Sequence, residues 1–267
     1  RFLPATKAQP KEMLPVVDKP IIQYIVEEAV ASGIEHIIFV TAVGKRALED
    51  HFDRNFELEY RLEQRGKQKD LELVSRVGKL AKFAFVRQSK PMGDGHAVLS
   101  ALPFIEEHEA VAVLFGDDIV VGKKPALKEL LEVYRRYNDP VVALERMPKD
   151  ELSRFGVIGG KRISARVREV NVLVEKPKPS EAPSDLAIIG KYILTPEVLK
   201  ILTTLQPGRD GEIRIADALA AYIKSQRSLY GVVLSGKRYD CGSKLGFLIA
   251  QVELGLQHPE LNGQFRD

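Results

Sequence analysis

The chain has 267 residues, 45% of them hydrophobic, which is enough to form a sizeable core and suits one large α/β domain. Its 40 Lys and Arg residues exceed the 37 Asp and Glu residues by three, and they are scattered among acidic neighbours, which speaks against nucleic acid as a partner. No apolar run approaches the roughly 18 residues that a membrane span needs, so we expect a soluble chain without a membrane partner.

Helices and strands are predicted to alternate through the first half of the chain. Apolar residues at helical spacing predict a helix that begins after Pro20 and ends at Gly33, and the apolar run from His36 to Thr41 predicts a strand. The alternation continues with helices over 45–52, 95–105 and 126–137 and strands over 82–88, 110–118 and 140–147. The charged stretch 54–80 predicts a solvated helical hairpin. This order is typical of helices that cover a largely parallel sheet.

The pattern changes near residue 150, where β-branched residues separated by Gly and Pro predict strands. These strands cover 155–160, 165–177 and 186–195, followed by helices over 196–205 and 212–226, a strand over 228–236 and a helix over 243–256. We expect residues 1–267 to form one domain. Its last helix exposes more apolar surface than a lone helix tolerates, which predicts a contact with another subunit.

The only cysteine and the first residue of the sequence give two further expectations. Cys241 excludes an internal disulfide, which fits the reducing environment of the cytoplasm. The sequence begins with Arg1 and not with Met, and we expect that its start has been cut away or processed.

Polar side chains follow several of the predicted strands, at the edge where open α/β sheets bind ligands. They are Gln88, Gly116 with Asp117 and Asp118, Glu175 with Lys176, and Asp240. Asp117 follows an apolar strand and a glycine, which is how a Mg²⁺ ligand is presented. Because Mg²⁺ takes one or two protein carboxylates beside substrate phosphates, Asp240 is the expected second ligand. The alternative is that Asp117 only caps the following loop.

The stretch "VEKPKP" is predicted to be extended, because Pro177 restricts the residue before it. Glu175 and Lys176 would then lie on opposite sides of the backbone, where one could hold a neutral polyol and the other a phosphate. A solvated strand end is the alternative.

Two further stretches suit a nucleotide. In "RQSKPMGDGHAV", Gly93 exposes its backbone amide before a helix, and the carboxamide of Gln88 can pair with the edge of a base, although a plain tight turn also explains the glycines. In "PKEMLPVVDKP", the prolines stiffen the chain, so Lys11 would lose little entropy beside a polyphosphate. The sequence contains no GxxxxGK[ST], GxSxG, HExxH or paired CxxC, which removes the main support for P-loop NTPases, serine hydrolases, zincins and zinc ribbons.

Taken in order, these motifs resemble those of the bacterial UTP–glucose-1-phosphate uridylyltransferases, also called UDP-glucose pyrophosphorylases, of the sugar nucleotidyltransferase superfamily. "RFLPATKAQPKEMLPVVDKPIIQY" is similar to the first signature of the family and "GDGHAV" to the second. "GDD", "VEKP" and "YDCGSKLG" follow in the expected order, so the resemblance covers nearly the whole chain.

The resemblance implies a Rossmann-like three-layer α/β/α fold with a mixed, mainly parallel central sheet. It implies that UTP and glucose 1-phosphate react with Mg²⁺ to give UDP-glucose and pyrophosphate in a cytoplasmic homodimer or homotetramer. Residues 1–150 would bind the nucleotide and residues 151–242 the sugar phosphate, with 243–267 as a possible oligomer contact. The implied roles, by position, are triphosphate binding by Arg1 and Lys11, uracil recognition by Gln88 and Gly93, Mg²⁺ binding by Asp117 and Asp240, sugar binding by Asp118, Gly156, Glu175 and Gly190, and sugar-phosphate binding by Lys176.

The sequence departs from the family pattern in two places. The glycine-rich Gly-x-Gly-Thr that precedes the arginine in the family is not part of this sequence. Asp94 stands where the family usually has leucine, and its carboxylate would either repel phosphate or point to solvent.

Three other functions remain to be weighed. A thymidylyltransferase would also use a carboxamide to read its base, and only a comparison of nucleotides separates the two. A non-catalytic sensor of sugar nucleotides would have lost the metal carboxylates, but Asp117 and Asp240 are both present. An NAD-dependent dehydrogenase needs GxGxxG after its first strand and an acidic residue about 20 positions later, and the sequence has neither.

Overall fold

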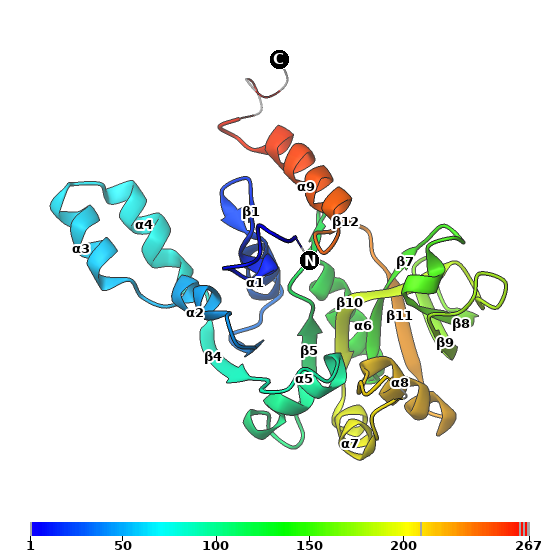
Figure 1. Cartoon of the computed structure of the whole chain (residues 1–267). Coiled ribbons are helices and arrows are strands. Elements are labelled where there is room, and N and C mark those ends of the chain that lie inside the picture. Colours follow the sequence, from blue (N-terminus) through cyan, green and yellow to red (C-terminus); the bar gives the residue numbers. More distant parts are fainter. Residues whose placement is uncertain (1, 209, 262, 264, 266–267) are drawn as a thin grey trace. The chain divides into compact units, whose positions relative to one another are not determined.

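The computed structural model describes residues 2–208, 210–261, 263 and 265 (Figure 1). These residues form two compact units. The first runs to Ser89 and adds Gly116–Ile119 and the residues from Arg238 on, and the second comprises Lys90–Phe115 and Val120–Lys237. The predicted limits at residues 150 and 242 do not coincide with these limits, and the single-domain organisation stays a prediction.

The first unit contains a parallel strand pair, a short antiparallel pair and several helices. Its elements are η1 (Lys11–Met13), β1 (Pro15–Val16), β2 (Lys19–Pro20), α1 (Ile21–Ala31), β3 (His36–Thr41), α2 (Arg46–Phe52), α3 (Phe56–Gln64), α4 (Gln68–Val77), β4 (Lys82–Arg87) and α9 (Lys244–Gln257). β3 and β4 pair in parallel along their whole length, because the chain returns between them through helices α2 to α4. α3 and α4 form the predicted solvated hairpin (Figure 1).

The second unit is built around a larger sheet. Its elements are α5 (Asp94–Ala101), η2 (Leu102–Phe104), β5 (Val111–Leu114), α6 (Ala126–Tyr137), β7 (Val141–Arg146), η3 (Leu152–Arg154), β8 (Gly156–Arg162), β9 (Val167–Glu175), β10 (Leu186–Leu194), α7 (Pro196–Thr204), α8 (Ile215–Lys224) and β11 (Leu229–Val233). The strand order is β5-β10-β7-β11-β9-β8. The chain passes between the units in β6 (Asp118–Val121) and β12 (Lys237–Asp240), which pair with each other.

The mixed sheet is confirmed, but the expectation that parallel pairs would dominate it is corrected. In the larger sheet β7 and β11 are parallel, whereas β10 is antiparallel to β5 and β7, and β9 is antiparallel to β8 and β11. The lengths of the connections between strands explain this difference. Parallel neighbours need a long crossover, as between β7 and β11, whereas β8 returns into β9 through a short hairpin.

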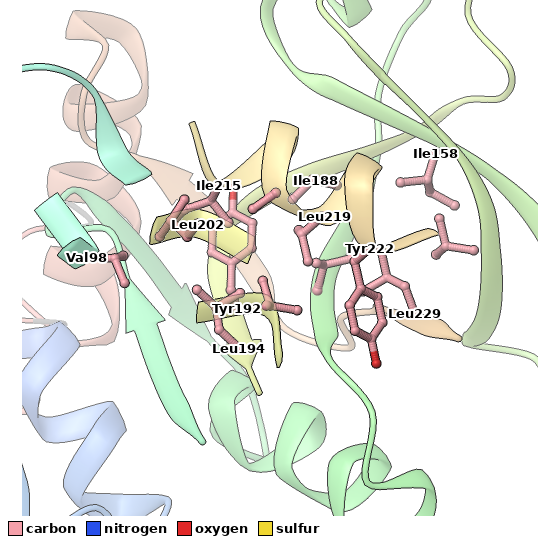
Figure 2. Packing of buried hydrophobic residues seen from close by; sticks show 14 of the residues in the cluster. Val98, Ile158, Ile188, Tyr192, Leu194, Leu202, Ile215, Leu219, Tyr222 and Leu229 are labelled. Carbon is pink, nitrogen blue, oxygen red and sulfur yellow. The ribbon is translucent and has the colours of Figure 1, made fainter. Parts of the chain in front are cut away.

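The core of the second unit lies between the sheet and helices α7 and α8 (Figure 2). It includes Val142 and Leu144 of β7, Tyr192 and Leu194 of β10, and a set of helix residues: Val198, Leu199, Leu202, Ile215, Ala218, Leu219 and Tyr222. Because side chains alternate along a strand, Val141 and its alternate neighbours face the opposite side, and α6 packs on these same strands there. Helices thus cover both faces, as the predicted three-layer fold requires.

Most predicted elements are confirmed to within a few residues. The helix after Pro20 is α1, and His36–Thr41 is β3. The predicted strand 110–118 is shorter than expected, because β5 ends at Leu114 and Asp118 already begins β6. Within the residues that the structure describes, no helix combines the length and apolarity needed to cross a membrane.

Candidate active site

Lys11 and Asp117 meet in the first unit. The 3-10 turn η1 begins after Pro10, whose φ of −68° is fixed by its ring, and this turn carries Lys11. The ammonium of Lys11 donates a hydrogen bond to Oδ2 of Asp117, which lies in the turn between β5 and β6. Burial alone would lower the pKa of Lys11, but the carboxylates of Asp117, Glu12 and Asp240 raise it above its ordinary value. Lys11 therefore stays charged beside these acidic groups.

The carboxylate of Asp240 lies close to that of Asp117. Its segment is held to that of Asp117 by the Cys241 amide, which donates to the Asp117 carbonyl at 2.9 Å. A Cβ on Gly242 would lie 2.7 Å from Oδ2 of Asp117 and 3.0 Å from Oδ1 of Asp240, so the two oxygens are no further apart than the sum of these distances. A side chain at residue 242 would displace both carboxylates. The missing side chain of Gly242 thus leaves a space that is lined by the carboxylates of Asp117 and Asp240.

This donor set fits Mg²⁺. Among the described residues, no group of three or more His, Cys, Asp or Glu side chains is arranged to hold a metal ion. Mg²⁺ usually needs fewer, because it binds one or two carboxylates and fills its remaining positions with water and substrate phosphates. Asp117 and Asp240 therefore provide what such a site requires from the protein.

Glu12 is a member of this cluster that the motif analysis did not single out. One of its oxygens accepts from Lys45 at 2.8 Å, while Oε2 is buried and has no hydrogen-bond partner among the described residues. A Cβ on Gly116 would lie 3.2 Å from Cγ of Glu12, so the glycine before Asp117 makes room for this side chain. Glu12 directly follows Lys11, and this adjacency is the signal that could have identified it.

Asp118 has a different environment from Asp117. Its side chain is 6% exposed and that of Arg238 is 10% exposed, and the two form an ion pair with N···O distances of 2.5 and 2.7 Å. The carboxylate is therefore committed to a buried guanidinium that joins β6 to β12, which argues against a side-chain contact with the sugar; the sugar-binding role of Asp118 stays a prediction. Arg238 was not singled out in the sequence, because nothing local connects residues 118 and 238.

Gln88 ends the parallel strand pair of the first unit. Its backbone amide donates to the Thr41 carbonyl at 2.8 Å, which extends the ladder of β3 and β4 by one residue. The carboxamide is thus carried at the carboxyl end of a strand, as predicted. Arg1 lies outside the described residues.

In the second unit the predicted sugar-binding residues occupy neighbouring strands. Gly156 of β8 is the register partner of Glu175 of β9, and a Cβ on Gly156 would lie 3.0 Å from Oε2 of that glutamate. Gly190 lies in β10 where the register with β7 shifts, and its carbonyl accepts from Phe115 at 2.7 Å. Burial raises the pKa of Glu175, and Asp94 and Asp217 raise it further, whereas Lys176 and Arg214 lower it.

Lys176 corrects the prediction of an extended "VEKP" segment. Its φ is +47°, in the left-handed region, because β9 ends at Glu175 and the amide of Lys176 turns back to donate to the Phe155 carbonyl at 3.0 Å. Nζ of Lys176 lies 3.8 Å from Oε1 of Glu175, so the two side chains lie on the same side and not on opposite sides. A bulky residue in this region costs on the order of 1 kcal/mol.

The loop before α5 is tightly held within the second unit. Gly93 has a φ of +97°, and a Cβ there would lie 2.5 Å from the Ile213 carbonyl, so a glycine is required. Asp94 neither points to solvent nor stands unpaired, because its Oδ1 accepts from the amides of Gly95 at 2.6 Å and Ile215 at 3.0 Å. The alternative that this carboxylate points to solvent is thereby corrected, whereas its repulsion of a phosphate stays a prediction.

The comparisons with known proteins identify the family of this chain. The sequence model of the family described as nucleotidyl transferase matches residues 1–255. The UTP–glucose-1-phosphate uridylyltransferase YngB of Bacillus subtilis (strain 168) is 47% identical over 99% of this chain and 88% of its own length. A crystal structure of UDP-glucose pyrophosphorylase complexed with UDP-glucose has 39% identity and a TM-score of 0.87, with 97% of this chain and 95% of that chain covered. UTP-bound UGPase from Acinetobacter baumannii has 36% identity and a TM-score of 0.88, with 100% and 93% covered.

The chain belongs to the nucleotidyl transferase family. Within that family, the resemblance to UTP–glucose-1-phosphate uridylyltransferases that the motifs suggest is confirmed by relatives at 44 to 48% identity over nearly its full length.

Proposed function

We propose that this protein joins UTP and glucose 1-phosphate to form UDP-glucose and pyrophosphate. The observation that carries the proposal is the meeting of Lys11, Asp117 and Asp240, which places a fixed cation and two metal-binding carboxylates together at strand ends. Relatives at about 47% identity that are named as uridylyltransferases support the choice of substrates.

The proposed reaction is a single in-line displacement. A phosphate oxygen of glucose 1-phosphate attacks the α-phosphorus of UTP, a new P–O bond forms, and the bond to the β-phosphate oxygen breaks to release pyrophosphate. The attacking oxygen is already an anion, so no general base is needed, and catalysis rests on positioning and charge neutralisation.

Residues of each unit are assigned separate tasks. In the first unit Arg1 and Lys11 bind the triphosphate, Gln88 recognises uracil, and Asp117 and Asp240 hold Mg²⁺. Mg²⁺ when bound neutralises charge on the phosphates. In the second unit the backbone of Gly93 contacts uracil, Gly156, Glu175 and Gly190 contact the glucose, and Lys176 binds its phosphate.

The test of the proposed function is pyrophosphate release from glucose 1-phosphate with each of UTP, dTTP, ATP, CTP and GTP, with and without Mg²⁺. We expect release with UTP that depends on the metal. Equal or faster release with dTTP would assign the protein to thymidylyl transfer. Binding of UDP-glucose without any release would identify a sensor.

We further propose that the protein is a homodimer or homotetramer that uses α9. Gln251 and Phe247 face the body of the first unit, where Gln251 bonds the backbone at both ends of β1 and Phe247 packs against Phe2. The opposite face carries an apolar stripe at helical spacing, with exposed side chains at Leu245, Leu248, Ile249 and Val252. A second copy of the same helix would cover this stripe.

Leu248→Glu is expected to shift the protein to a smaller species, because a charge would be buried in that contact. Sedimentation velocity measures the change, and Leu73→Glu on the exposed α4 is the matched control that should leave the mass unaltered. A monomeric wild type, or a Leu248→Glu variant of unchanged mass, would contradict the proposal.

The predicted cytoplasmic location, which rests on the single cysteine, is retained as part of the proposal.

A further inference from the structure

One carboxylate in the second unit lies at the start of two helices. Asp94 is the first residue of α5, and its Oδ1 also accepts from the amide of Ile215, the first residue of α8. The N-terminal end of a helix has unpaired amides and a partial positive charge, and a carboxylate there is stabilising. Asp94 therefore serves both helices, although 121 residues separate it from Ile215.

The second helix depends on this distant acceptor. Its N-cap residue is Arg214, whose guanidinium carries only donors and therefore cannot cap an amide. Arg214 instead pairs with Glu212 at 2.9 Å and with Asp210. Asp94 fills the place that Ser, Thr, Asp or Asn usually takes at the N-cap of a helix.

Backbone hydrogen bonds reinforce this junction. The amide of Ile213 donates to the Met92 carbonyl at 2.7 Å, and the amide of Gly95 donates to the Ile213 carbonyl at 2.9 Å. The segment that carries Gly93 is thus held directly to the segment that enters α8. These backbone bonds do not depend on the side chain at residue 94, so a change there removes only the cap.

The junction is connected to the sugar-binding glutamate. α8 packs against β9, which ends at Glu175, and Ile215 is buried in the core between α7 and the sheet (Figure 2). The charges that act on Glu175 include Asp94 itself, Arg214 just before α8 and Asp217 in its first turn. The position of the start of α8 therefore sets the surroundings of Glu175.

We propose that Asp94 is a positioning residue that caps α8 and thereby fixes Glu175 for the sugar. The inference rests on the proposed function for its link to glucose 1-phosphate. It assigns a role to the one side chain in "GDGHAV" that departs from the family pattern.

The test compares Asp94→Ala, Asp94→Asn and wild type. Asp94→Ala removes the acceptor, so amide exchange in the first turn of α8 should rise about 5-fold, the ratio to which the typical stability cost of a lost helix cap corresponds. KM for glucose 1-phosphate should rise as well. KM for UTP should change little, because the backbone bonds of the Gly93 loop remain. Asp94→Asn keeps an oxygen acceptor and is expected to restore both the exchange and KM.

The matched control is Glu107→Ala, an exposed carboxylate of the same unit, which should leave exchange and KM unchanged. An Asp94→Ala variant with unaltered KM and exchange, or an Asp94→Asn variant as impaired as Asp94→Ala, would overturn the proposal. If Asp94→Ala does not fold, Asp94→Glu displaces the same acceptor by one methylene and should show the same rise in KM. Absence of pyrophosphate release by wild type would instead contradict the proposed function, and the exchange experiment would still decide whether Asp94 caps α8.

Discussion

Asp117→Ala is expected to lower kcat/KM for UTP and glucose 1-phosphate by about 30-fold or more. The carboxylate is one of two that border the space beside Gly242, and its loss removes a metal ligand and the partner of Lys11. Removing one major electrostatic group from an active site costs about 2 kcal/mol or more of transition-state stabilisation, which corresponds to that ratio. Pyrophosphate release at fixed Mg²⁺ measures the change.

Stability should change much less than activity in this variant, because the side chain of Lys11 is 34% exposed and remains solvated without its partner. Asp50→Ala is the control, since Asp50 is an exposed carboxylate of the same unit that lies 3.5 Å from Arg46. An Asp117→Ala enzyme with wild-type activity at unchanged Mg²⁺ would remove Asp117 from the site.

The sequence predicted those parts of the site that depend on a strand end and on chain order. Asp117 follows an apolar run, and Gln88 follows another, and both lie where a strand ends in the structure. Lys11 was located by the prolines around it, because a stiff segment has few conformations to choose from. These residues are positioned by local geometry, which the sequence contains directly.

The sequence could not predict contacts made by residues that are far apart along the chain. Lys176 precedes a proline, so local rules favour an extended backbone, but the Phe155 carbonyl draws its amide into a turn. Asp118 has the same local pattern as Asp117, yet a guanidinium 120 residues away commits it to a buried ion pair. In both cases a tertiary partner outweighs the local preference, and a single sequence carries no signal of that partner.

The same limit applies to the direction of the strands. Alternating helices and strands predict parallel pairs, and β3 and β4 follow that rule. β10 does not, because it enters between β5 and β7 in the opposite direction and buries every residue along its length. Its sequence, apolar apart from Gly190 and Lys191, is typical of a strand covered on both faces, a pattern that gives no information on direction.

Asp118→Ala is expected to destabilise the protein by about 3 kcal/mol, because it deprives the buried guanidinium of Arg238 of its carboxylate. Replacing both partners by apolar residues, as in Asp118→Leu with Arg238→Met, should recover most of this loss, since the cost comes from an uncompensated buried charge and not from the absence of the pair. Urea unfolding at pH 7 measures the free energy of unfolding of each variant.

The exposed pair of Arg46 and Asp50 is the comparison for this second prediction. Its side chains are 87% and 64% exposed, so Asp50→Ala should change the free energy of unfolding by less than about 1 kcal/mol. If Asp118→Ala is no more destabilising than Asp50→Ala, then Arg238 reaches water in the folded protein and the pair is not structural. In that case the carboxylate of Asp118 would again be a candidate for binding the sugar, because the observation against that role is its burial with Arg238.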